Sequence, residues 1–88
     1  MKELKVSTKI ANNGTAKISA TTGTVICVTA VTNAHSADTT VTFADDSDLG
    51  VLEMPLETTL NLTIPIRCAS FTPSHADMSV VYYEEHKI

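Results

Sequence analysis

The sequence has no tryptophan, three glycines, three prolines and only 5% aromatic residues, although 43% of its 88 residues are hydrophobic. A core made from this chain must therefore consist of small and β-branched side chains, and 14 threonines and eight valines are available for it. Branched side chains pack well on a pleated sheet and lose rotamer freedom in a helix. The composition favours a β-protein, and the length allows one domain.

Basic residues are also scarce: six Lys and Arg stand against ten Asp and Glu, which gives a net charge of −4. Such a chain offers no positive surface to a phosphate backbone, so we expect no nucleic-acid binding. No stretch approaches the roughly 18 consecutive apolar residues of a membrane-spanning helix, so we expect no membrane partner. Residues 1–6 (MKELKV) lack the apolar run of a secretory signal, which favours folding in a cytosol.

Only two cysteines are present, Cys27 and Cys68, and strand-like residues flank both of them. Thiols normally stay reduced in a cytosol, and a buried free cysteine behaves as a small hydrophobic residue. We therefore expect two inert core thiols. A disulfide and a reactive thiol are the less favoured alternatives.

Alternation with a period of two is clearest in residues 60–68 (LNLTIPIRC), where every even-numbered position is apolar. A strand places such alternating residues on opposite faces. The predicted inward side chains are Leu60, Leu62, Ile64, Ile66 and Cys68. The predicted outward side chains are Asn61, Thr63 and Arg67. Pro65 cannot donate a ladder hydrogen bond, which predicts an edge strand or a bulge.

Five further strands are predicted, at residues 16–20, 24–31, 39–44, 50–56 and 78–84. Residues 24–31 are apolar on both faces, which indicates a central strand. Val41 and Phe43 should point inward, and Val80 and Tyr82 should share one face of the last strand. Residues 69–77 are expected to be the longest loop. Six short strands separated by turns predict an all-β fold, a small antiparallel β-sandwich that is jelly-roll-like or Ig-like.

The domain organisation divides at a hinge-like NNG at residues 12–14. Residues 15–88 should form the single β-sandwich domain, and residues 1–14 either an N-terminal arm or a first edge strand. An extended arm can add a strand to a neighbour's exposed edge. Its lysines carry half of the chain's positive charge, and its aliphatic residues would be apolar anchors. The candidate partner-binding residues are Lys2, Leu4, Lys5, Val6, Lys9 and Ile10.

No catalytic, cofactor or metal site is predicted. The acidic turn at residues 45–48 (DDSD) could attract calcium, but its glycine spacing and flanking strands do not match an EF-hand, so we expect a solvated turn. His35, His75 and His86 lack metal-ligand spacing, and no CxxC is present, so solvated loop histidines are favoured over a zinc site. No nucleophile motif or phosphate-binding loop is found, so we expect no enzyme.

Five phrases of the chain follow one another in a characteristic order: GTVICV (23–28), TVTF (40–43), LGVL (49–52), PLETTLNLTIPIRC (55–68) and DMSVVYY (77–83). This order resembles that of small β-sandwich virion proteins of tailed bacteriophages, over about residues 15–84. The chain departs from the family at residues 69–75 (ASFTPSH), where the family has a glycine-rich stretch.

The resemblance implies a structural role in the virion, assembled in the host cytoplasm, with capsid decoration or cementing of the head as the first expectation. A tail or fibre component is the alternative within that class, and a host-factor-binding module outside the virion is the alternative from another class. The expected partners are the major capsid protein or another virion protein. Because small β domains often assemble around symmetry axes, we also expect a homo-oligomer, in particular a trimer.

Overall fold

A computed structural model describes residues 9–11, 15–44 and 50–86 of the chain. Its strands are β1 (Lys9–Ala11), β2 (Ile18–Ser19), β3 (Thr24–Asn33), β4 (Thr39–Ala44), β5 (Val51–Met54), β6 (Thr58–Cys68), β7 (Ser70–Pro73) and β8 (Met78–His86). None of the described residues belongs to a helix that is long and apolar enough to cross a membrane.

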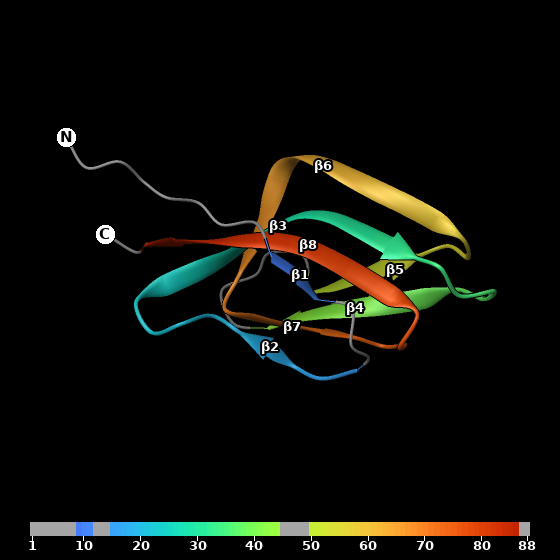
Figure 1. The fold of residues 1–88 in the computed structure, drawn as a ribbon, viewed down its shortest axis with the longest axis horizontal. Helices are drawn as coiled ribbons and strands as arrows, with labels where there is room; N and C mark the ends of the chain where they lie inside the picture. Colours follow the sequence, from blue (N-terminus) through green and yellow to red (C-terminus); the bar gives the residue numbers. More distant parts are fainter. Residues whose placement is uncertain (1–8, 12–14, 45–49, 87–88) are drawn as a thin grey trace.

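The strands form two four-stranded antiparallel sheets that pack face to face, in the orders β1-β8-β3-β6 and β2-β7-β4-β5 (Figure 1). β1 pairs with β8, β2 with β7, β3 with β6 and β4 with β5. This is the pairing of one long hairpin rolled up into two layers, which is a jelly roll. The predicted small antiparallel β-sandwich is confirmed, and its strand order is that of the jelly roll rather than the Ig fold.

The core lies between the two sheets and consists mainly of β-branched and aromatic side chains. β3 is central in its sheet, as predicted, with β8 and β6 as its neighbours. Val41 and Phe43 of β4 are buried, and so are Val80 and Tyr82 of β8, in agreement with the predicted faces. The alternation therefore assigned these side chains to the correct face of each strand, because only one face of each strand is fully buried.

The prediction for Ile64 is wrong. Leu62 and Ile66 pack against the core, but the side chain of Ile64 is 82% exposed. The register between β3 and β6 shifts, because Val28 pairs with Ile66 while Ala30 pairs with Asn61. Four residues of β6 thus pass opposite a single residue of β3, and β6 arches away from the sheet (Figure 1). Pro65 lies in this irregular stretch, which is the bulge that a proline without an N–H predicts.

The prediction that residues 69–77 form one long loop is also wrong. Four of these residues form β7, which lies between β2 and β4 in the second sheet. Phe71 of β7 is fully buried, and its ring meets that of Tyr82 edge-on, with centroids 5.4 Å apart. Ser, Thr and Pro gave this segment the composition of a loop, but the buried Phe71 holds it in the sandwich.

Candidate functional site

The exposed large apolar side chains of the described residues come from two strands and the turn between them. Among the described residues, the exposed large hydrophobic side chains are Val51 (51%), Leu56 (47%) and Ile64 (82%). They come from β5, from the turn that follows it and from β6. β5 and β6 are each the last strand of their sheet, and they contact one another, so the two sheet ends lie on the same side. We call this surface, β5 and β6 with the turn at Leu56, the β5–β6 edge.

The turn in this surface is held by polar contacts. Asp38 accepts a hydrogen bond from the backbone N–H of Leu56 (3.1 Å), and Thr58 donates its hydroxyl to the carbonyl of Pro55 (2.7 Å). Glu57 adopts a φ of 52°, a left-handed conformation that is uncommon outside glycine. Leu56 is therefore presented on a fixed turn.

Backbone groups add to what the β5–β6 edge can bind. Within the described sheets, β5 and β6 each have a strand neighbour on one side only. The other side of such a strand presents N–H and C=O groups that a strand from another chain can pair with. At Ile64, the bulge also leaves an aliphatic side chain in water, which forgoes about 2 kcal/mol of burial free energy. The edge combines main-chain pairing capacity with apolar anchors.

Of the predicted partner-binding residues, the two that the structure describes lie away from the β5–β6 edge. Lys9 and Ile10 lie in β1, where they pair with Tyr82 and Val81 of β8, at the end of the sheet opposite β6. Lys2, Leu4, Lys5 and Val6 lie outside the described residues. The docking role of the N-terminal segment therefore stays a prediction. Sequence reasoning did not find the β5–β6 edge, although Pro65 was a signal for its bulge.

The two cysteines are buried and unlinked, as the favoured interpretation requires. Only Cys68 belongs to the core cluster, where burial raises its pKa to about 11. Cys27 lies on the other face of β3, beneath an ion pair in which Arg67 Nη1 donates to Glu85 Oε2 at 2.6 Å. Its thiol donates to the same carboxylate oxygen at 3.6 Å, and burial raises its pKa as well. Both sulfurs are held as thiols at neutral pH, so neither has the thiolate character of a nucleophile.

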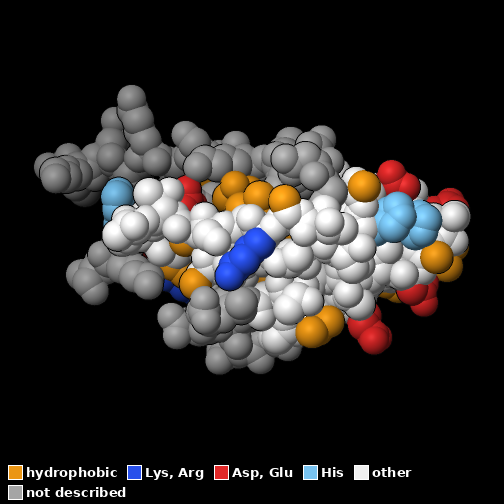
Figure 2. Space-filling view, turned by 90° about the horizontal axis from the view of Figure 1, so that it is seen from below, with side chains coloured by type: hydrophobic (Ala, Val, Ile, Leu, Met, Phe, Trp, Pro, Cys, Tyr) orange, Lys and Arg blue, Asp and Glu red, His pale blue; other side chains and the backbone are white. Residues whose placement is uncertain are grey.

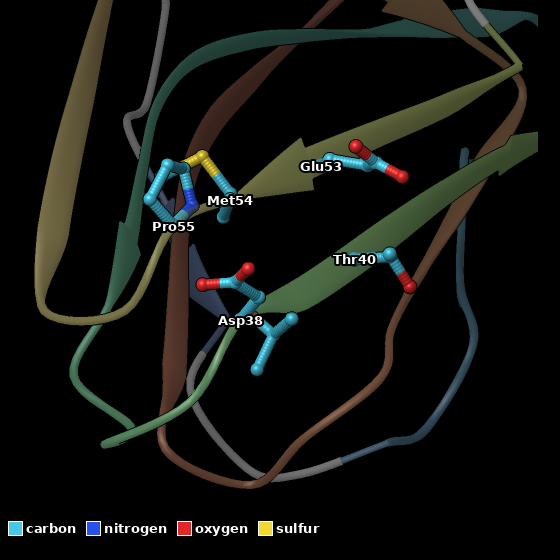
Figure 3. A pocket seen from close by; sticks show the side chains of 6 residues that line it. Asp38, Thr40, Glu53, Met54 and Pro55 are labelled. Carbon is cyan, nitrogen blue, oxygen red and sulfur yellow. The ribbon is translucent and has the colours of Figure 1, made fainter.

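A hollow of about 260 Å³ lies against β4 and β5. Its lining includes Asp38, Thr40 and Glu53, which Figure 3 shows together with Met54 and Pro55. The two carboxylates do not point toward one another in Figure 3, and one oxygen of Asp38 is already occupied by the backbone of Leu56. This arrangement does not pair an acid with a base, and it is open to solvent at both carboxylates.

The histidines depart from expectation. His35 and His75 are not separate solvated side chains: their rings stack with centroids 3.6 Å apart, and Asp77 lies beside both. The sequence did not predict this pair, because the two histidines are far apart along the chain. Only the pairing of β3 with β8 brings the loop after β3, which carries His35, next to the loop before β8, which carries His75. His86 is exposed at the opposite end of that ladder. The acidic turn at residues 45–48 lies outside the described residues.

Comparisons with protein-family models, with curated proteins and with solved structures find no match to this chain. Its function must therefore be inferred from its own residues and geometry.

Proposed function

We propose that this chain is a structural protein of a bacteriophage virion, in the first place a capsid decoration or cement protein that binds the head. The observation that carries the proposal is the β5–β6 edge, where every exposed large hydrophobic side chain of the described residues is found. The order of strand phrases noted in the sequence supports the same class. Many viral capsid domains have a jelly-roll fold, and this analogy of fold supports the same class.

A surface that is rigid before binding loses less conformational entropy when it binds a shell. Within the β5–β6 edge, Leu56 is held in this way on a turn fixed by Asp38 and Thr58, while Ile64 projects from the bulge of β6. Covering an exposed isoleucine fully contributes about 2–3 kcal/mol, and a partner strand adds main-chain hydrogen bonds. In the expected trimer, three linked copies of such a contact reinforce each other.

The proposal is tested first on particles. Virions from the host strain that carries the gene are purified, separated into heads and tails, and digested for mass spectrometry. Recovery of the chain in the head fraction supports the decoration role. Recovery in the tail fraction supports the tail or fibre alternative, and absence from all particles refutes a virion function.

A second experiment tests the surface. Empty capsids are mixed with the purified chain and sedimented, and the bound fraction is compared between Ile64→Asp and the control Ser19→Asp. Both positions are exposed, and Ser19 lies on β2, at the end of its sheet opposite β5, so both variants add the same charge without burying it but only one adds it to the β5–β6 edge. We expect Ile64→Asp to weaken binding by at least about tenfold, since about 1.4 kcal/mol accounts for a factor of ten. Equal binding of both variants would refute the role of the β5–β6 edge.

The expected homo-oligomer is part of the proposal and has its own measurement. Light scattering of the purified chain should report a trimer. A monomer in solution that also fails to bind capsids would remove the cement role.

A further inference from the structure

Two chain connections meet at one end of the sandwich. The β3–β4 connection carries His35, and the β7–β8 connection carries His75 and Asp77. Asn33, the last residue of β3, pairs with Met78, the first residue of β8, so both connections leave neighbouring strands at the same place. The backbone N–H of Ala34 donates to the carbonyl of Asp77 at 3.0 Å and ties the two connections together. Figure 2 shows histidine side chains gathered at this end of the molecule among acidic ones.

The position of His35 is fixed from below by Asn33, a polar side chain that is only 1% exposed. The amide nitrogen of Asn33 donates to the carbonyls of Ala37, Met54 and Pro55, each at 3.1 Å. Its amide oxygen accepts the backbone N–H of His35 at 2.9 Å. One buried amide thus joins the β3–β4 connection to the end of β5, which makes the loop that carries His35 rigid.

The position of His75 is fixed within its own turn. The backbone N–H of Asp77 donates to His75 Nδ1 at 3.1 Å, and the N–H of Met78 donates to the carbonyl of His75 at 3.4 Å. Because Nδ1 accepts this hydrogen bond, its lone pair points at the backbone N–H of Asp77 and must leave that donor before it can bind an ion. A neutral imidazole with its proton on the other nitrogen is the form that binds a metal.

The three side chains converge. Asp77 Oδ2 lies 3.5 Å from His35 Nδ1 and 3.7 Å from His75 Nδ1, and one ligand atom from each residue lies within 4.8 Å of the other two. In a tetrahedral zinc site with bonds of about 2.0–2.1 Å, neighbouring ligand atoms stand about 3.3 Å apart. The distances from Asp77 to the two imidazoles need to shrink by only a few tenths of an ångström. The two rings are stacked, with an angle of 17° between their planes, so one of them must also turn for both in-plane lone pairs to face the same ion. The half-buried histidines and the exposed carboxylate leave the centre open to an ion from solvent.

We propose that His35, His75 and Asp77 form a binding site for one Zn²⁺ ion, with the fourth position open to water. Two imidazole nitrogens and one carboxylate oxygen suit zinc and its transition-metal neighbours, whereas Mg²⁺ and Ca²⁺ require oxygen ligands throughout. The ion replaces the hydrogen bond from Asp77 to His75 Nδ1 by a metal bond, and it joins two connections that are 40 residues apart in the chain. The three proposed ligands lie outside the β5–β6 edge, and zinc binding is measured without capsids, so the site is tested separately from the virion role; the carbonyl of His35 does accept the N–H of Glu57, in the turn of that edge, at 3.2 Å.

The first test uses the unaltered chain. Zn²⁺ is titrated into ¹⁵N-labelled protein, and the imidazole resonances of all three histidines are followed by NMR. We expect saturable shifts at His35 and His75 at one equivalent and none at His86. Shifts at His86 alone, shifts at the cysteines, or no shift at all would overturn the proposal. The same titration with Mg²⁺ should leave every imidazole resonance in place.

The second test uses variants. The dissociation constant for Zn²⁺ is measured by competition with a chromophoric chelator for the unaltered chain, for His75→Gln and for Asp77→Asn. The control is His86→Gln, an exposed histidine at the far end of the β3–β8 ladder. Loss of a ligand should weaken binding by at least about tenfold, while the control should bind as the unaltered chain does. An equal affinity in His75→Gln and His86→Gln would refute the site.

Cobalt distinguishes this site from one that uses the thiols. Co²⁺ bound to imidazole and carboxylate should show the visible bands of a tetrahedral ion without a thiolate charge-transfer band. Appearance of that band would place the ion at Cys27 or Cys68 and overturn the assignment. Circular dichroism of each variant shows whether a loss of zinc binding results from a loss of folding. The NMR titration of the unaltered chain tests the zinc site without any variant.

Discussion

Replacing Phe71 by alanine should destabilise the protein strongly. The ring is fully buried in β7, opposite Ile18 on one side and Phe43 on the other, and it meets Tyr82 edge-on. Removing it leaves roughly 100 Å³ unfilled, which at about 24 cal/mol per Å³ corresponds to about 2.4 kcal/mol. Loss of the ring's own transfer free energy adds about 2 kcal/mol. We therefore expect the free energy of unfolding to fall by about 4 kcal/mol, a large share of the roughly 4–13 kcal/mol expected for a domain of this size.

Urea unfolding followed by far-ultraviolet circular dichroism measures this change. Phe71→Ala should lower the transition midpoint with little change in slope. Ile64→Ala is the matched control, because it also removes apolar atoms from a strand but from an exposed position, and it should change stability by less than about 0.5 kcal/mol. Phe71→Leu, which keeps most of the volume, should lose less than Phe71→Ala. A loss below about 1 kcal/mol for Phe71→Ala would show that residues 70–73 form a surface loop, as the sequence had predicted.

Three further outcomes are expected. Ile66→Asp should lower the free energy of unfolding by more than about 2 kcal/mol and Ile64→Asp by less than about 1 kcal/mol; equal losses in urea melts would contradict the bulge. Arg67 holds the pKa of the Glu85 carboxyl below its ordinary value of 4.5 through their hydrogen bond, so the stability this pair contributes is present above pH 4.5 and is lost as the pH falls through the lowered pKa. Arg67→Ala should raise the pKa of Glu85 in an NMR titration, and an unchanged titration would refute the coupling. Burial raises the pKa of Cys68 from 9.0 to about 11, so stability should fall as the pH rises from 9 to 11, and Cys68→Ala should show a shallower fall in melts across that range.

Much of the fold follows from the sequence alone, because the strands with one dry face repeat their apolar residues every second position. Val41 with Phe43, and Val80 with Tyr82, could be assigned to the core from this repeat, and all four are buried. Residues 24–31 could be assigned to a sheet centre because they are apolar on both faces. The alternation of apolar and polar residues was sufficient to assign these side chains to the core, since the identity of the neighbouring strand does not alter which face of a strand is buried.

The sequence was not sufficient to predict burial where a bulge or a strand that is distant in the chain determines it. Ile64 follows the same alternation as Leu62 and Ile66, and only the register shift against β3 turns it to solvent. Phe71 sits in a segment with the composition of a loop, and it becomes a core residue because β2 and β4 are there to pair with it.

The histidine cluster shows the same division. The chain separates His35 from His75 by 40 residues, so no spacing rule detects them as a pair. The rolled hairpin places β3 beside β8 and thereby brings the two connections within hydrogen-bond distance of each other. The sequence thus determined that this protein is a β-sandwich with a β-branched core, since alternation and side-chain shape are local properties. The exposed edge and the histidine cluster depend on which strands become neighbours, and only the tertiary structure decided that.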